Sequence, residues 1–204
     1  MVDTSLNRHL FSHKRDLQSI KDKHTYPINY SRPGLLVLFN YQNFDDKKHY
    51  RAGSEKDVEN VTRLFKRFNY EIKQHLDKSA AQTLEIISEY ARRDYSNDTC
   101  VIFFIMSHGN ENGKILASNE EWINVNDFVQ PFKFVKSLTR KPKLFFIQAC
   151  RGGDRMKFIG DVFANEEKFE HDGPSLDKDD DANVPIEADF LFCYSTVEGY
   201  YSLR

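Results

Sequence analysis

The 204-residue chain has few cysteines and no excess of either charge. Its three cysteines, Cys100, Cys150 and Cys193, are odd in number and far apart, which suits neither a disulfide framework nor a paired zinc motif. The 29 lysines and arginines are balanced by 31 aspartates and glutamates, so the chain has no net positive charge to attract nucleic acid. These absences exclude a disulfide-stapled secreted domain and give no support to nucleic-acid binding.

Export and membrane signals are also missing. The N-terminal stretch MVDTSLNRHLFSHKRD lacks the apolar segment of a signal peptide. The longest apolar run, CVIFFIM, is far too short to span a bilayer. We therefore expect a cytoplasmic protein in a reducing compartment, with no membrane partner. Hydrophobic residues make up 40% of the chain, enough for one substantial core, which predicts a single domain with flanking segments.

Apolar strand patterns alternate with helical ones after a polar leader. Residues 1–32 show no sustained apolar period and are expected to form a loosely ordered leader or pro-segment. Strands are predicted within 34–44, 70–76, 100–109, 143–153 and 188–197. This βαβα order predicts an α/β fold, a mostly parallel twisted sheet with helices on both faces.

Three helices are expected between these strands. The first begins at Ser54 as N-cap, and its apolar face comprises Val58, Val61, Leu64, Phe65 and Phe68. In the second, Ser79 and Gln82 have the spacing of a capping box. Its buried stripe is predicted to be Leu84, Ile87 and Ala91. A short third helix is expected near 125–132.

Polar residues end two of the predicted strands, at SHG (107–109) and QACRGG (148–153). In open parallel sheets, ligands bind at the carboxyl ends of strands. A cysteine there is more often a buried structural thiol than a nucleophile, and we expect Cys100 and Cys193 to be packed and unreactive. Cys150 differs, because His108 would lie at the same edge and could supply the base that a thiol nucleophile needs. A glycine after each candidate allows amide groups to approach a reacting carbonyl.

With these residues the sequence resembles the caspases, cysteine proteases that cleave after aspartate. IQACRGG, with SHG upstream, is similar to the family's cysteine and histidine motifs. RAGSEKDVENVTRLF and VPIEADFLFCYSTVEGYYSLR extend the resemblance, which covers residues 34–204. It implies a caspase-like sheet, with Cys150 as nucleophile, His108 as its proton-transfer partner, and the amides of Gly109 and Cys150 as the oxyanion hole. The side chains implied to bind the substrate aspartate are Arg51, Gln148 and Arg204. Neither a cofactor nor a metal is expected, because the remaining histidines lack metal-ligand spacing.

The resemblance also predicts how the chain is divided. Residues 33–172 would form the large-subunit region, 173–184 an acidic intersubunit linker, and 185–204 the start of the small subunit. Family precursors are cut between the subunits, and Asp172 is the preferred cleavage site, with Asp181 as the alternative. Caspase domains continue beyond the arginine matching Arg204, so five of the family's six strands are expected.

Two functions remain open at this stage. The first is an aspartate-specific cysteine endopeptidase acting in apoptosis, made as a zymogen. The second is a short caspase-like protein that does not cleave but binds and regulates a full-length caspase. The implied partners are protein substrates containing aspartate, other caspase chains in homodimers or heterodimers, and inhibitor-of-apoptosis proteins.

Overall fold

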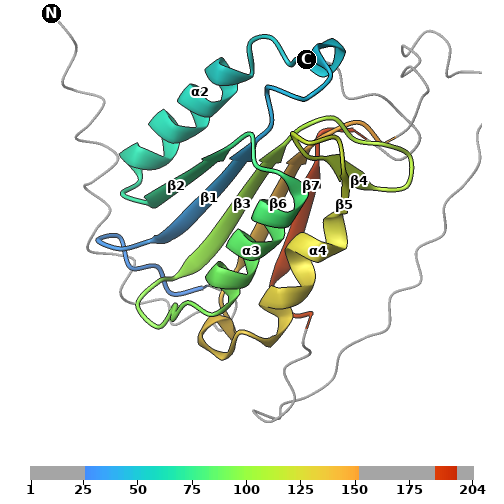
Figure 1. The fold of residues 1–204 in the computed structure, drawn as a ribbon. Helices are drawn as coiled ribbons and strands as arrows, with labels where there is room; N and C mark the ends of the chain where they lie inside the picture. Colours follow the sequence, from blue (N-terminus) through green and yellow to red (C-terminus); the bar gives the residue numbers. More distant parts are fainter. Residues whose placement is uncertain (1–25, 152–186, 197–204) are drawn as a thin grey trace, which may run out of the picture.

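A five-stranded parallel sheet forms the centre of the protein (Figure 1). The computed structural model describes residues 26–151 and 187–196. Its central strands are β1 (Gly34–Asn40), β2 (Glu71–Leu76), β3 (Cys100–Met106), β6 (Lys143–Gln148) and β7 (Phe190–Tyr194). They lie in the order β2-β1-β3-β6-β7, and every pairing is parallel. The predicted fold class and the five strands are confirmed.

Helices cover both faces of this sheet (Figure 1). α2 (Ser54–Arg67) packs on one face through Val61 and Phe65. α3 (Ala80–Ala91) and α4 (Val125–Val129) cover the opposite face, and the 3-10 helices η3 (Gln130–Phe134) and η4 (Lys136–Leu138) follow α4. A small antiparallel hairpin, β4 (Lys114–Leu116) and β5 (Trp122–Asn124), lies outside the main sheet. The hairpin was not predicted, because three-residue strands are too short to show a period.

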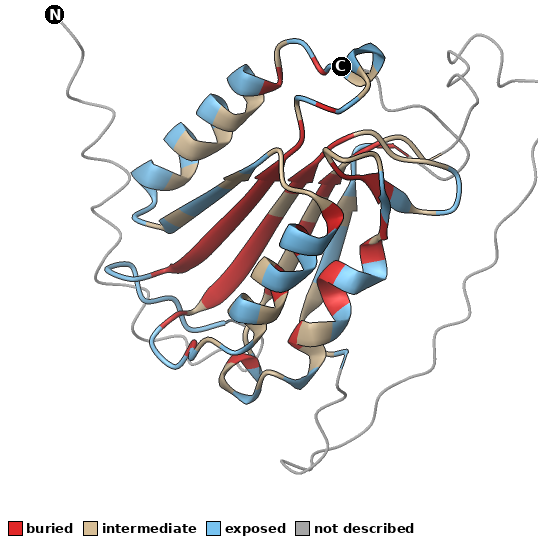
Figure 2. Ribbon diagram, in the orientation of Figure 1, coloured by how far each residue is buried: buried red, intermediate tan, exposed pale blue. Residues whose placement is uncertain are grey.

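The inner strands β1 and β3 are buried on both faces, as their continuous apolar runs predict, whereas the edge strands β2 and β7 are largely exposed (Figure 2). All seven residues of β1 are buried. On the face covered by α3 and α4, the rings of Phe103 and Phe145 stack with centroids 4.9 Å apart. Phe145 also stacks on Phe190 and Phe192 of β7, at 6.0 and 5.5 Å. Stacking between aromatic rings therefore links β3, β6 and β7 on this face of the sheet.

The predicted start and buried face of α2 need correction. Gly53, in the left-handed region at φ 81°, is the N-cap, and Ser54 is the first helical residue. Ser54 is buried and accepts a hydrogen bond from Asn40 Nδ2 at 3.1 Å. Leu64 and Phe68 are 48% and 59% exposed. α2 packs over β1 and the edge strand β2, so the outer part of its apolar stripe has no sheet beneath it.

The capping box of α3 is confirmed, because the side chains and amides of Ser79 and Gln82 bond reciprocally. Its predicted stripe is wrong at Leu84, which is 41% exposed. Thr83 is buried instead, and its hydroxyl pairs with that of Tyr41 at 2.8 Å. An apolar pattern could not identify a threonine that is buried through a hydrogen bond.

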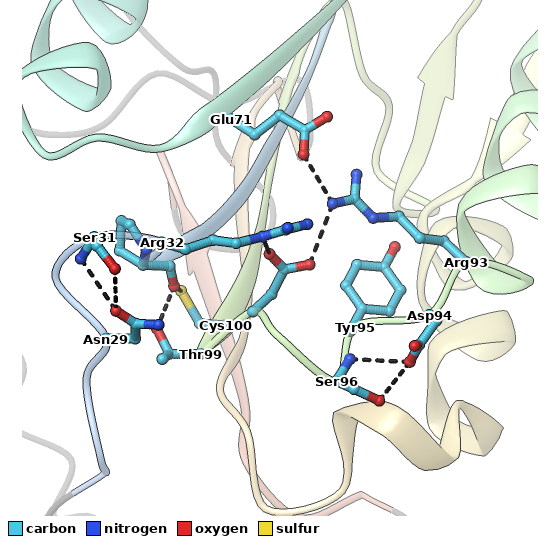
Figure 3. Close-up of polar contacts among 12 residues, drawn as sticks. Asn29, Ser31, Arg32, Glu71, Arg93, Asp94, Tyr95, Ser96, Thr99 and Cys100 are labelled. Atoms are coloured by element: carbon cyan, nitrogen blue, oxygen red, sulfur yellow. Dashed lines mark hydrogen bonds and ion pairs between the residues drawn. The ribbon is translucent and has the colours of Figure 1, made fainter.

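Near the amino ends of the strands, a cluster of charged side chains forms ion pairs between distant parts of the chain (Figure 3). Asp98, almost fully buried, accepts from Arg32 Nε at 3.0 Å and from Arg93 Nη2 at 3.2 Å. Arg93 also binds Glu71 at 2.8 Å. The guanidinium of Arg93 holds the pKa of the Glu71 carboxyl below its usual value. Arg32 therefore anchors the described end of the predicted leader; residues 1–25 lie outside the described part.

The two remaining cysteine predictions have different outcomes. Cys100 is buried, with its Sγ 3.2 Å from the hydroxyl of Tyr70, and burial raises the pKa of its thiol. Cys193 is only half-buried, so its expected packing is wrong; β7 is an edge strand in this sheet. Among the described residues, no helix combines the length and apolarity needed to cross a membrane.

Candidate active site at the carboxyl edge of the sheet

The loops that carry the candidate catalytic residues leave the sheet at the same edge. β3 and β6 pair in register up to Met106 and Gln148. The next amide, that of Ser107, donates to the carbonyl of Gln148 at 3.1 Å. His108 follows one residue later on one loop, and Cys150 follows two residues after Gln148 on the other. The structure therefore brings the two segments to one rim.

Gly109 and Cys150 come into close main-chain contact. A Cβ atom placed on Gly109 would lie 2.3 Å from the carbonyl oxygen of Cys150 and 3.3 Å from its nitrogen. It would also lie 2.8 Å from the Cβ of Ala149. Because real Cβ atoms do not approach other atoms so closely, only glycine allows this contact. The two loops are thus adjacent at the level of the backbone.

A β-bridge between Gly109 and Ile115 supports this loop. Its hydrogen bonds run from the Leu116 amide to the His108 carbonyl at 3.0 Å and from the Asn110 amide to the Lys114 carbonyl at 3.2 Å. Both bonds flank Gly109, so the bridge fixes the loop without using the Gly109 amide. The β4–β5 hairpin thereby holds the glycine beside Cys150.

His108 is oriented by a main-chain carbonyl. Its Nε2 lies 2.7 Å from the carbonyl oxygen of His49. A carbonyl oxygen only accepts, so Nε2 carries the proton and Nδ1 is the nitrogen that gains or loses one. The ring is also packed against Phe44, with centroids 5.3 Å apart, and against the ring of His49 at 5.7 Å. The contribution of His49 was missed because a carbonyl leaves no side-chain signature in the sequence.

Cys150 is a half-buried free thiol. Next to it, the guanidinium of Arg151 lies 4.1 Å above the ring centroid of Tyr194 in β7. This cation–π contact secures the loop of Cys150 to the neighbouring strand. Sequence reasoning missed this contact, because Tyr194 is distant along the chain.

Arg51 is a buried cation at the same rim, 7% exposed. Its Nη1 donates to the carbonyls of Tyr41 and Met106, at 2.7 and 2.9 Å, and contacts Asn40 Oδ1 at 3.2 Å. These acceptors replace the water lost on burial. Asn40 is a supporting residue that sequence reasoning missed, although a polar residue ending an apolar strand was the signal that identified Gln148.

Gln148 lies beside this arginine, because Met106, which accepts from Arg51, is its register partner. It lines a cavity of about 350 Å³ on the α2 face of the sheet. The lining residues are Asp57, Asn60, Val61, Phe104, Met106, Phe146, Ile147, Gln148, Cys193, Tyr194 and Ser195. Of the predicted aspartate-binding residues, Arg51 and Gln148 are therefore neighbours. Arg204 and both predicted cleavage sites, Asp172 and Asp181, lie outside the described residues.

Comparisons with known proteins agree with this architecture. The family model described as Caspase domain matches residues 33–204. Caspase drICE of Drosophila melanogaster is 35% identical over 196 residues, covering 94% of this chain and 56% of the relative. Caspase-3 of Bos taurus is 31% identical over 207 residues, covering 100% of this chain and 71% of the relative.

A solved structure gives the same result. The crystal structure of Caspase-1 from Spodoptera frugiperda matches with a TM-score of 0.72 and 28% identity, covering 88% of this chain and 65% of that one. The chain thus spans little more than half the length of the first of these relatives. Since the family model covers most of the sequence, including the whole sheet and both candidate loops, the chain belongs to the caspase family.

Proposed function

We propose that this chain provides the catalytic residues of a cysteine endopeptidase that cleaves peptide bonds after aspartate. The observation that carries the proposal is the main-chain contact between Gly109 and Cys150 at the rim where His108 is also held. A thiol, an imidazole and two neighbouring amides are the groups that acyl transfer from a peptide requires. The family membership of the chain supports the same reaction class.

In this mechanism the thiolate of Cys150 attacks the carbonyl carbon of the scissile bond. The carbonyl oxygen becomes an oxyanion and accepts hydrogen bonds from the amides of Gly109 and Cys150. His108 gives its Nδ1 proton to the leaving amine, while Nε2 keeps its bond to the carbonyl of His49. Water then hydrolyses the thioester and restores the thiol.

Preference for aspartate would come from the cationic side of the rim. Transferring a carboxylate out of water is unfavourable unless charge-assisted hydrogen bonds replace its hydration. Arg51 is suited to this task, because three acceptors at Nη1 fix the plane of its guanidinium. We assign Gln148 and Arg204 to the same carboxylate.

The predicted division of the chain belongs to this proposal. Residues 33–172 would form the large subunit and 185–204 the start of the small one, with precursor cleavage at Asp172. We also propose that the reaction serves apoptosis in the cytoplasm, with dimeric association with other caspase chains and control by inhibitor-of-apoptosis proteins.

The second candidate function is that of a non-catalytic regulator of a full-length caspase. Apolar side chains of the edge strand β7 are exposed, Leu191 at 50% and Phe192 at 41%, which favours a protein that binds a partner. The presence of both Cys150 and His108 favours the enzyme, since a pure binding protein requires neither side chain.

A labelling experiment separates the two functions without requiring turnover. The full chain is treated with a peptidyl-aspartyl chloromethyl ketone, and the modified residue is identified by mass spectrometry. We expect alkylation at Cys150, strongly reduced with the matching asparaginyl reagent and absent in Cys150→Ala, whereas Cys193→Ala labels normally. Equal labelling by both reagents, or labelling of Cys193 alone, would refute the aspartate-specific enzyme.

Mixing the chain with a full-length caspase tests the regulator. Cleavage of an aspartyl fluorogenic peptide by the chain alone, lost in Cys150→Ala, supports the peptidase. If the aspartyl chloromethyl ketone does not label the chain, and the chain and its Cys150→Ala variant change the cleavage rate of the partner equally, the result supports the regulator instead.

A further inference from the structure

Three potential metal ligands meet beside the segment that holds His108. Asp46 caps the 3-10 helix η2 (Lys47–His49), His49 is the last residue of that helix, and Glu120 lies in the turn between β4 and β5. Each offers one ligand atom, and these atoms all lie within 4.8 Å of one another. Sequence spacing did not reveal the group, because Glu120 is 71 residues away from His49.

One pair of ligand atoms already has the separation that a tetrahedral zinc site requires. With zinc bonds of roughly 2.0–2.1 Å, two ligand atoms in a tetrahedron lie about 3.3 Å apart. His49 Nδ1 and Glu120 Oε1 are already 3.1 Å apart. Only the carboxylate of Asp46 has to move closer. Its Oδ1 caps the Lys48 amide at 3.0 Å, which leaves Oδ2 to turn toward the ion.

The competing interaction at that oxygen is weak. Asp46 Oδ2 pairs with Lys48 Nζ at 3.6 Å, and the lysine side chain is 87% exposed. Surface ion pairs of this kind contribute little, so a divalent cation displaces the ammonium group at small cost. The side chains of the three ligands are between 32% and 44% exposed, which leaves the group open to an ion from solvent.

The two loops are held together by one main-chain bond and by one bond to a proposed ligand. The Asp45 amide donates to the Ser118 carbonyl at 3.0 Å, across the same pair of segments. The Asp46 amide donates to Glu120 Oε1 at 2.7 Å. Because the main chains are already adjacent, an ion that binds here has to immobilise few additional rotatable bonds. Preorganisation of this kind favours the affinity for the ion.

We propose that Asp46, His49 and Glu120 form a binding site for a zinc ion, with water as the fourth ligand. One imidazole and two carboxylates suit zinc, whereas magnesium and calcium prefer sites made of oxygen ligands alone. The site adjoins the proposed catalytic dyad of Cys150 and His108, because the carbonyl of His49 accepts a hydrogen bond from His108 Nε2. Metal bound to the His49 ring therefore acts on the residue that orients His108. The binding itself does not rest on the proposed proteolysis.

Zinc titration against a chromophoric chelator tests the site on the full chain. We expect Glu120→Gln and Asp46→Asn to weaken zinc binding by about tenfold or more, as loss of a metal-binding contact does. The amides keep the shape and the hydrogen-bond acceptors of the originals, so folding is preserved and can be checked by circular dichroism. Glu121→Gln, an exposed neighbour outside the cluster, is the matched control and should bind zinc as the parent does.

Two further variants locate the ion. Cys150→Ala and His108→Ala remove the thiol and imidazole of the proposed dyad, which could themselves hold zinc. We expect zinc to bind to Cys150→Ala with parental affinity. Binding that is lost with His108→Ala or Cys150→Ala but unchanged in Glu120→Gln would place the ion at the dyad and overturn the proposal. The absence of zinc binding to the parent chain would also overturn it.

Discussion

Replacing Gly109 with alanine should separate the two loops of the candidate site. The added methyl group would lie 2.3 Å from the Cys150 carbonyl oxygen and 2.8 Å from the Ala149 Cβ, where ordinary contacts begin near 3.4 Å. The Cys150 carbonyl and the Ala149 Cβ cannot turn aside as the end of a flexible side chain could. The two segments must therefore move apart by about 1 Å. Forcing an extra methyl group into a packed site costs about 1–3 kcal/mol. We expect the free energy of unfolding to fall by about 2 kcal/mol, measured by urea denaturation.

The same displacement should reduce reactivity at Cys150. Moving reacting groups by about 1 Å can lower a rate by about 100-fold, and the Gly109 amide is one of the two proposed oxyanion donors. We therefore expect the aspartyl chloromethyl ketone to label Gly109→Ala about 100-fold more slowly than the parent chain. Iodoacetamide, which forms no tetrahedral oxyanion, should label the two chains at more similar rates.

Gly113→Ala provides the control for a general glycine effect. Gly113 has φ 67°, and a Cβ placed there meets no atom within 4 Å. Its alanine variant should lose about 1 kcal/mol through backbone strain alone and should label at nearly the parental rate. If Gly109→Ala is as stable and as reactive as Gly113→Ala, the loops are not in the contact described and the reasoning fails.

Three other substitutions test the fold. Asp98→Asn should lower the free energy of unfolding by about 2–3 kcal/mol, because it weakens charged hydrogen bonds to Arg32 and Arg93; a loss no larger than that of the exposed control Asp94→Asn would contradict this. Ser79→Ala should cost about 1 kcal/mol through loss of the α3 cap, and an unchanged urea midpoint would argue against the capping box. Burial lowers the pKa of His75, so its contribution to stability is full above its unfolded value of about 6.5 and is lost as the pH falls through the folded pKa. The parent should therefore lose more stability than His75→Gln between pH 7.5 and 5; equal losses would show that His75 does not titrate in this way.

The order of elements could be predicted because the inner strands β1, β3 and β6 are largely buried on both faces. Such strands are continuous apolar runs, and the polar residues that end them therefore stand out. The segments SHG and QACRGG stood out in this way, directly after β3 and at the end of β6, whereas the role of Gln148 was implied by the resemblance to the caspases. The prediction failed where burial depends on tertiary neighbours: Thr83 is buried and bonded to Tyr41, while Leu64 on α2 is exposed.

The supporting contacts of the site were beyond prediction for a different reason. The orientation of His108 depends on a carbonyl, and any residue type could supply that atom. The Asp46, His49 and Glu120 cluster depends on two loops meeting, which no local spacing encodes. Sequence patterns therefore identify groups that must be chemically special, whereas the backbone atoms that position them become visible only in three dimensions.

The aromatic stack across β6 and β7 has a consequence for a nicked molecule. Residues 152–186 connect these strands covalently, yet β6 and β7 also pair from Lys143 and Phe190 to Ile147 and Tyr194. Phe145 adds ring contacts to both phenylalanines of β7. A cut anywhere within 152–186 would thus yield two polypeptides that separate under denaturing electrophoresis but migrate together by native gel filtration.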